Sequence, residues 1–123
     1  MFKRNDIANL NNILWAIEKI ELSVAEIRSV SELANHEEKY DSVIVKLMNI
    51  GESAFNLSEE LKNNFKNVDW WGMYKMRNII THSYHSLDEN IVWDIIRNEL
   101  PKNKIEIKHI ADSLINTSLK SDH

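Results

Sequence analysis

Residues that form turns are unusually scarce in this chain. Its 123 residues include only two glycines and one proline, and both residue types mark turns and loops. A sheet of many strands needs a turn between each pair of strands, whereas long helices need few. About 43% of the residues are hydrophobic, which is enough for a buried core. We therefore expect a single all-α domain that spans residues 1–123.

Hydrophobic residues recur at helical spacing along most of the chain. The short polar run at 34–37 and the asparagine-rich segment 62–68 interrupt this pattern and are predicted to be loops. The predicted helices are 6–31, 37–61, 69–80, 88–100 and 101–119. Such a series indicates an antiparallel bundle of about five helices.

Several residues are placed where helices are expected to begin. Asn5 or Asp6 can cap the first helix, Asp69 the third and Asp88 the fourth. Pro101 fits the first turn of the last helix, where its missing N–H costs nothing.

The chain contains no cysteine, so disulfides, thiolate metal sites and a cysteine nucleophile are excluded. The charged N-terminus is not followed by a hydrophobic run of the kind found in signal peptides. No stretch approaches the roughly 18 apolar residues of a membrane-spanning helix. We expect a soluble, cytoplasmic protein that does not associate with membranes.

The charge is unevenly distributed. The whole chain has a net charge of −4, but residues 62–85 carry four lysines and arginines against one aspartate, a local charge of +3. A local phosphate-binding site is therefore plausible on an otherwise acidic molecule, whereas broad coating of a nucleic-acid duplex is not.

The basic window contains a cluster of residues suited to cleaving RNA. Arg77 carries a planar, permanently charged group that fits phosphate oxygens, and Asn78 can both donate and accept hydrogen bonds. His82 can exchange a proton near neutral pH. A histidine could take the proton of a ribose 2′-OH while arginine stabilises the charge on the attacked phosphate. The alternative is that Arg77 only caps its helix or pairs with a carboxylate.

The spacing of Arg77 and His82 raises a geometric problem. Five positions correspond to about 140° around a helix, so the two side chains would not share a face. Either the helix ends before His82, or two subunits build the site together across a two-fold axis. Trp70 and Trp71 also favour self-association, because adjacent residues cannot both lie in one narrow core stripe. The alternative is that both tryptophans fill one wide core.

The run Arg77-Asn78-X-X-X-His82-X-Tyr84 resembles the motif of HEPN domains, and the tyrosine points to their HepT-like branch. The resemblance extends over about residues 5–115. Thr81 and His85 depart from the usual pattern beside the motif. The segments that carry the wider resemblance are 50–54, 57–61, 68–70, 91–93 and 100–101.

The resemblance implies a homodimeric ribonuclease toxin that needs neither metal nor other cofactor. Its partner would be an antitoxin nucleotidyltransferase of the MntA type, which in this family adds AMP to the motif tyrosine, here Tyr84. The catalytic residues would be Arg77 and His82, supported by Asn78. An adenylate beside them would occupy the phosphate site and repel RNA. The alternative is a HEPN adaptor without catalysis, which binds nucleotide for a nucleotidyltransferase.

Three further residues have open roles. Glu52 could orient Arg77 or His82 from another helix, and Gly51 beside it suggests a close approach of two helices, because glycine is otherwise unfavourable within a helix. His85 could support His82 or, with it, hold a metal at i, i+3 spacing. The absence of cysteine argues against the metal.

Overall fold

The computed structural model describes residues 4–81 and 88–121, with the side chains of 5–78 and 88–116. All regular structure in these residues is helical, as predicted. No described helix has the length and apolar character needed to cross a membrane. The helices are α1 (Arg4–Ser23), α2 (Val30–Asn35), α3 (Glu37–Phe55), α4 (Glu59–Asn64), α5 (Trp70–Thr81), α6 (Glu89–Asp94) and α7 (Leu100–Ser121), with a π-helical segment (Ile95–Glu99) between the last two.

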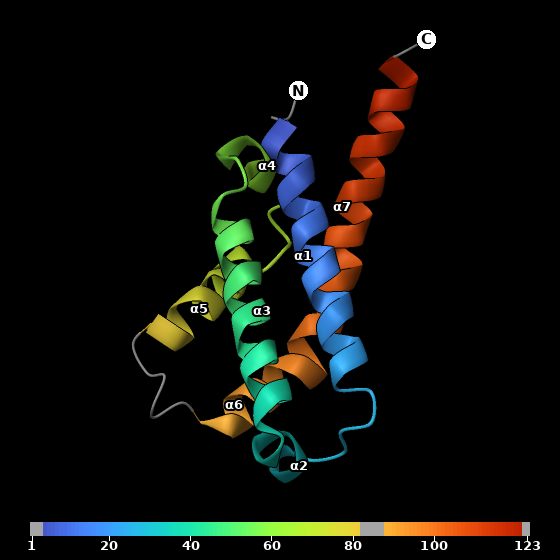
Figure 1. Cartoon of the computed structure of the whole chain (residues 1–123). Helices are drawn as coiled ribbons and strands as arrows, with labels where there is room; N and C mark the ends of the chain where they lie inside the picture. The colour runs from blue at the N-terminus through green and yellow to red at the C-terminus, as the bar shows by residue number, and fades with distance from the viewer. Residues whose placement is uncertain (1–3, 82–87, 122–123) are drawn as a thin grey trace.

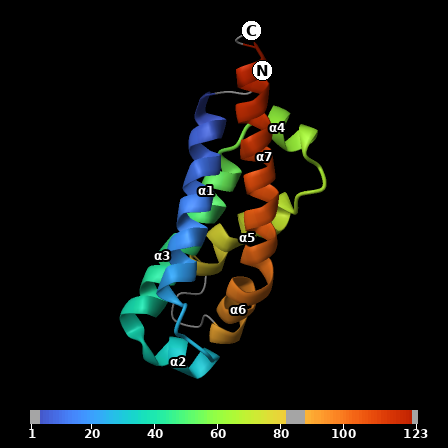
Figure 2. The ribbon, with the colours of Figure 1, turned by 90° about the vertical axis from the view of Figure 1, so that its right-hand side faces the viewer.

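The long helices lie side by side in the order α5, α3, α1, α7 (Figure 1). α1 runs antiparallel to both α3 and α7, which confirms the antiparallel bundle. Figure 2 shows that α2 and α6 close one end of the bundle, where their ends approach each other. α3 is therefore an inner helix of the bundle, in contact with α1 on one side and α5 on the other.

The core is aliphatic and continuous from α1 to α7. It also includes two methionines of α5, which fill irregular spaces well. Side chains that are almost fully buried at its centre are Leu10, Ile13, Ile17, Ile20, Ile44, Leu47, Ile50, Met73, Met76 and Ile107.

Two of the predicted helices are each divided into a long and a short helix. The first ends at Ser23 rather than near Ser31, and α2 (Val30–Asn35) begins a few residues later. The predicted loop at 34–37 is wrong except at His36, because α2 continues to Asn35 and α3 begins at Glu37. The side chain of Ser29 caps α2 by accepting a hydrogen bond from the Glu32 N–H at 3.2 Å. A capping serine satisfies a free N–H at a helix start, so it favours a new helix here. Apolar spacing alone does not reveal such a break.

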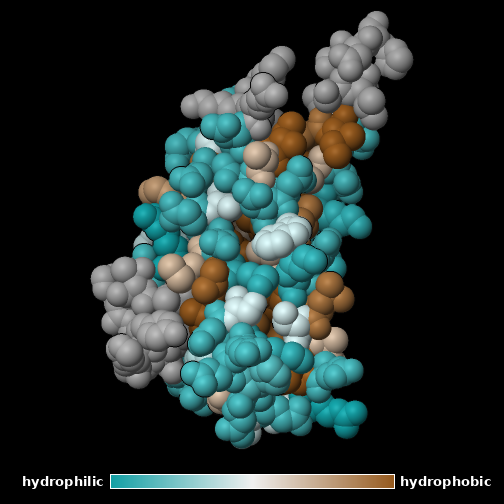
Figure 3. Space-filling model, in the orientation of Figure 1, coloured by the Kyte–Doolittle hydropathy of each residue, from teal (hydrophilic) through white to brown (hydrophobic). Residues whose placement is uncertain are grey.

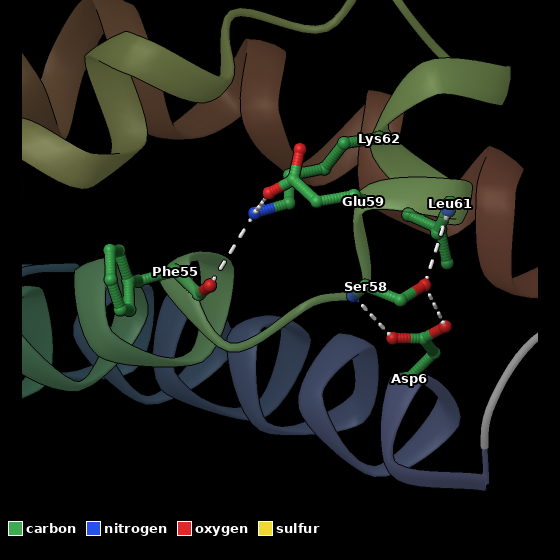
Figure 4. A network of polar contacts seen from close by, with 6 residues as sticks. All are labelled: Asp6, Phe55, Ser58, Glu59, Leu61 and Lys62. Carbon is green, nitrogen blue, oxygen red and sulfur yellow. Dashed lines mark hydrogen bonds and ion pairs between the residues drawn. The ribbon is translucent and has the colours of Figure 1, made fainter.

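The second predicted helix divides at Ser58. The Ser58 hydroxyl caps α4 by accepting from the Leu61 N–H at 3.2 Å, and the predicted loop from residue 62 begins only after Asn64. Asp6 is not the cap of its own helix, because α1 begins at Arg4. Its buried carboxylate instead accepts from the Ser58 N–H at 2.8 Å and the Ser58 hydroxyl at 2.6 Å (Figure 4). These bonds tie the start of α1 to the start of α4.

The remaining caps agree with the sequence prediction. Asp69 accepts from the Gly72 N–H at 2.9 Å, and Asp88 accepts from the Asn90 N–H at 2.9 Å. Pro101 lies in the first turn of α7. The Leu100 N–H, just before it, bonds to Ile95 O in the π-helical segment. This wider turn separates α6 from α7, at a place where proline would disturb a regular helix.

Candidate functional site

The site begins where α3 and α5 cross. Gly51 of α3 faces the backbone of Arg77 on α5, and a Cβ atom placed on Gly51 would lie 2.7 Å from Arg77 Cβ and 2.9 Å from Arg77 Cα. It would also overlap the Arg77 backbone nitrogen. The predicted close approach of two helices at Gly51 is confirmed, and the neighbouring helix carries the motif arginine.

Two side chains of α3 hold the Arg77 guanidinium. The Glu52 carboxylate pairs with Arg77 Nε at 3.0 Å. The ring centroid of Phe55 lies 4.2 Å from Arg77 Cζ, so the guanidinium stacks over an aromatic face. Glu52 and Phe55 are three positions apart and share one face of α3. The charge is thus positioned at a partly exposed surface, with 39% of the arginine side chain accessible to solvent.

A second layer of contacts lies behind the phenylalanine. Tyr74, one turn before Arg77 on α5, meets the Phe55 ring edge-on, with centroids 6.0 Å apart. Lys62 Nζ lies 5.0 Å from the centre of the Tyr74 ring. It also contacts Phe55 O at 3.4 Å and Glu59 Oε1 at 3.2 Å (Figure 4). The lysine of α4 therefore links the end of α3 to the middle of α5.

Lys62 keeps its charge although it is buried. Burial lowers its pKa, but hydrogen bonds to Tyr74 and Glu59 outweigh this effect and leave the pKa above its ordinary value. The basic window therefore includes one lysine with a structural role.

The other predicted site residues are only partly covered by the structure. Asn78 is exposed on α5, next to Arg77. α5 is described as far as Thr81, and His82, Tyr84 and His85 lie outside the described residues. Arg77 and His82 could be brought together by an end of the helix before His82 or by a site shared between two subunits, and both explanations stay predictions.

The two adjacent tryptophans have opposite environments. Trp70 is 9% exposed, and its indole N–H donates to Phe65 O at 3.0 Å. Trp71 is 66% exposed, with Lys75 Nζ 5.9 Å from its ring. The alternative that both fill one wide core is wrong, because Trp71 lies at the surface and only Trp70 lies in the core. Within 4–81 and 88–121, no three potential metal-ligating side chains gather in a cluster.

The model of the HepT-like ribonuclease family matches residues 13–110 of the chain. The chain belongs to this family. The match includes α3, α5 and the whole predicted motif. It confirms the resemblance read from the motif, and with it the predicted enzyme class, an endoribonuclease.

Individual relatives of this HepT-like chain support the assignment. "Putative RNase MJ0127" of Methanocaldococcus jannaschii is 34% identical over 93% of both chains. "Probable ribonuclease HepT" of Thermococcus cleftensis is 29% identical over 83% of this chain and 92% of that protein. "Gamma-glutamylcyclotransferase and putative RNase MJ0434" of M. jannaschii is 30% identical over 85% of this chain, which spans only 47% of that relative. No solved structure matches the chain.

The sequence analysis missed two residues that shape the site of this HepT-like chain. Phe55 lies within the predicted helix 37–61 but received no role there; its side chain is 51% exposed and stacks against the Arg77 guanidinium. Lys62 was assigned to a loop, but it is buried in α4. The sequence held one signal for Phe55. Glu52 and Phe55 are at i, i+3 spacing on one helix, as Tyr74 and Arg77 are on the other.

Proposed function

We propose that this protein is a metal-independent endoribonuclease toxin of a toxin–antitoxin pair, which cleaves RNA at a site shared by two copies of the chain. The observation that carries the proposal is the restrained guanidinium of Arg77, which Glu52 and Phe55 hold in place five positions before His82 in the sequence. A pre-positioned charge stabilises a transition state at little reorganisation cost.

The proposed reaction needs only protein side chains. His82 removes the proton of a ribose 2′-OH, and the 2′-oxygen forms a bond to the adjacent phosphorus while the bond to the 5′-oxygen breaks. A protonated histidine returns a proton to the leaving 5′-oxygen. The products are a 2′,3′-cyclic phosphate and a 5′-hydroxyl. Arg77 stabilises the extra negative charge on phosphate, and Asn78 supplies hydrogen bonds.

A dimer would explain how arginine and histidine side chains that do not share a helix face can meet at one site. A two-fold axis beside α5 brings two motifs together, so one histidine serves as base and the other as acid. Trp71 is exposed on α5, and tryptophans are frequent anchors of interfaces between subunits, which supports self-association.

The partner of the proposed toxin is an MntA-type nucleotidyltransferase that transfers AMP to Tyr84. The added phosphate carries negative charge into the neighbourhood of Arg77 and would compete with RNA for it. Co-expression with such an enzyme, followed by peptide mass analysis, should show AMP on Tyr84. An unmodified tyrosine in protein that has lost its toxicity would contradict this mode of control.

The decisive test of the reaction is RNA cleavage by purified protein in the presence of EDTA. Wild-type protein should leave 2′,3′-cyclic phosphate ends, and Arg77→Ala and His82→Ala should each lower the rate by at least about 100-fold. A non-catalytic adaptor would instead show the same trace activity in wild type and both variants, and its expression alone would not arrest growth.

A further inference from the structure

We propose that a depression between α1 and α3 binds one base of the RNA next to the scissile phosphate. It is lined by Asn12 and Trp15 of α1 and by Asn49, Glu52 and Ser53 of α3, and its volume is about 220 Å³. Pockets for drug-sized ligands are larger, about 300–1,000 Å³, so this one suits a single ring system. The inference rests on the proposed ribonuclease function.

The lining has the chemistry that recognises an unstacked base. Proteins bind single-stranded RNA by stacking bases on aromatic rings and by hydrogen bonds to their edges. Trp15 is 53% exposed and offers a broad indole face. Asn12 and Asn49 each provide a donor and an acceptor, and neither amide has a hydrogen-bond partner among the described side chains and backbone. Both are therefore available to a ligand.

Helical spacing explains how the two helices build one depression. Asn12 and Trp15 are three positions apart on α1, while Asn49, Glu52 and Ser53 lie at i, i+3 and i+4 on α3. Each set therefore forms a row on one side of its helix, and the rows meet where α1 packs on α3. In Figures 1 and 3 this pair of helices faces the viewer, and the surface they form is mainly hydrophilic, with less polar residues between.

Glu52 connects the depression to the proposed cleavage site. Its carboxylate lines the depression and also pairs with Arg77 at 3.0 Å. Lys19 Nζ lies 6.0 Å from the ring centre of Trp15. A base seated here would thus lie near two cations, Arg77 and Lys19, that can attract the phosphates of the same strand.

A 2′-O-methyl RNA oligonucleotide lacks the attacking hydroxyl and cannot be cleaved, so its binding measures base recognition alone. Fluorescence anisotropy with wild-type protein and Trp15→Ala should show about tenfold weaker binding by the variant, in the range of base–aromatic stacking. Leu22→Ala is the matched control, since Leu22 is exposed on the same helix but outside this depression. It should bind as wild type does.

A second experiment uses cleavable RNA in which single bases are replaced by abasic ribose. At one position beside the cut, loss of the base should lower kcat/KM for wild type but not for Trp15→Ala, because both changes remove the same contact. Equal losses in both proteins would overturn the proposal. Asn49→Ala should alter which base is preferred there.

The outcomes separate this proposal from the proposed function. Cleavage with an unchanged Trp15→Ala binding constant overturns the base site and leaves the ribonuclease intact. Tryptophan-dependent binding without cleavage supports the base site and overturns the ribonuclease mechanism. A Trp15→Ala variant that becomes monomeric by light scattering, while wild type and Leu22→Ala stay dimeric, would show that a second copy covers the depression and would overturn the proposal.

Discussion

Two ion pairs between neighbouring helices can be compared directly within the described residues. Arg77 of α5 pairs with Glu52 of α3, and Lys104 of α7 pairs with Glu21 of α1. Both distances are 3.0 Å, and the side chains are similarly exposed, 39% and 54% in the first pair and 35% and 50% in the second. By distance and solvent access alone the two pairs are equivalent.

Their surroundings differ. At the first pair, Gly51 lets the backbones of α3 and α5 approach, and Phe55 lies under the guanidinium. The second pair joins two exposed side chains; hydrogen bonding to Glu21 and its charge raise the pKa of Lys104. Exposed ion pairs contribute little to stability. What distinguishes the candidate site is therefore its backbone contact and aromatic support, with the ion pair as an addition.

The largest effect is expected from Gly51→Ala. The new methyl group would meet the Arg77 backbone, which can move only with α5, and overpacking of this kind costs about 1–3 kcal/mol. The gain in helix propensity, about 1 kcal/mol, offsets part of this cost. Displacing the arginine by an ångström could also slow RNA cleavage about 100-fold. Thermal unfolding and cleavage assays measure the two effects.

Gly72→Ala is the matched control. Its Cβ would meet the side chain of Asp69 rather than backbone, with the carboxyl carbon 2.9 Å away. A side chain can rotate aside, so the loss should stay within about 1 kcal/mol, the usual value of a helix cap. If both alanine variants unfold at the same temperature, the backbone contact at Gly51 is not what distinguishes the two regions.

Exchanging the cations should affect the two pairs unequally. Arg77→Lys keeps the charge but loses the planar fork and its stacking on Phe55, so cleavage should fall about 100-fold with little change in Tm. Lys104→Arg should alter neither the cleavage rate nor Tm. Cleavage rates and melting curves of both variants test this, and full activity of Arg77→Lys would show that charge alone suffices.

Neutralising the acids is expected to have a smaller effect. Glu52→Gln should lower kcat about three- to tenfold, because the arginine loses orientation, while KM changes less. Glu21→Gln should leave both constants unchanged and shift Tm by at most about two degrees. Steady-state kinetics would contradict the positioning role of Glu52 if only KM rose.

The smallest effect on stability is expected at Glu106, which lies near two other acidic side chains. Burial raises the pKa of Glu106, with Asp69 and Glu99 acting in the same direction and Lys102 opposing. One of its oxygens is buried without a partner in the described residues. The folded state thus binds the proton more tightly than the unfolded state. This contribution to stability is complete below the ordinary glutamate pKa and is lost as the pH rises from there through the raised pKa of the folded state. Glu106→Gln should raise Tm by about a degree or two near pH 7 but not near pH 4.

Much of the fold was predictable because it depends on local patterns. Scarce glycine and proline, helical apolar spacing and the caps at Asp69 and Asp88 led to the observed all-α bundle. The breaks at Ser29 and Ser58 were missed, because apolar spacing continues across both. The Ser58 break also depends on Asp6, and a contact between residues 52 positions apart leaves no local signal.

The candidate site was predictable only in part, and the chemistry assigned to Arg77 and His82 stays a prediction. The motif identified Arg77, and glycine within a helix at Gly51 correctly indicated a close approach. Residue spacing could not show which helix approaches Gly51. It also could not show the role of Phe55, because residues at i, i+3 spacing can be buried in a core as readily as they can contact another side chain at the surface. The depression at Trp15 depends on how α1 meets α3, which only packing determines.

The contact at Gly51 has a genetic consequence. It is made with the backbone and Cβ of residue 77, which are shared by nearly every amino acid, so replacing the arginine leaves the helix crossing in place. A cell that silences this chain by a mutation at that codon would still accumulate a folded protein. If two chains share one cleavage site, the silent copies would pair with active ones, and the mutant allele would act as a dominant suppressor of the ribonuclease activity.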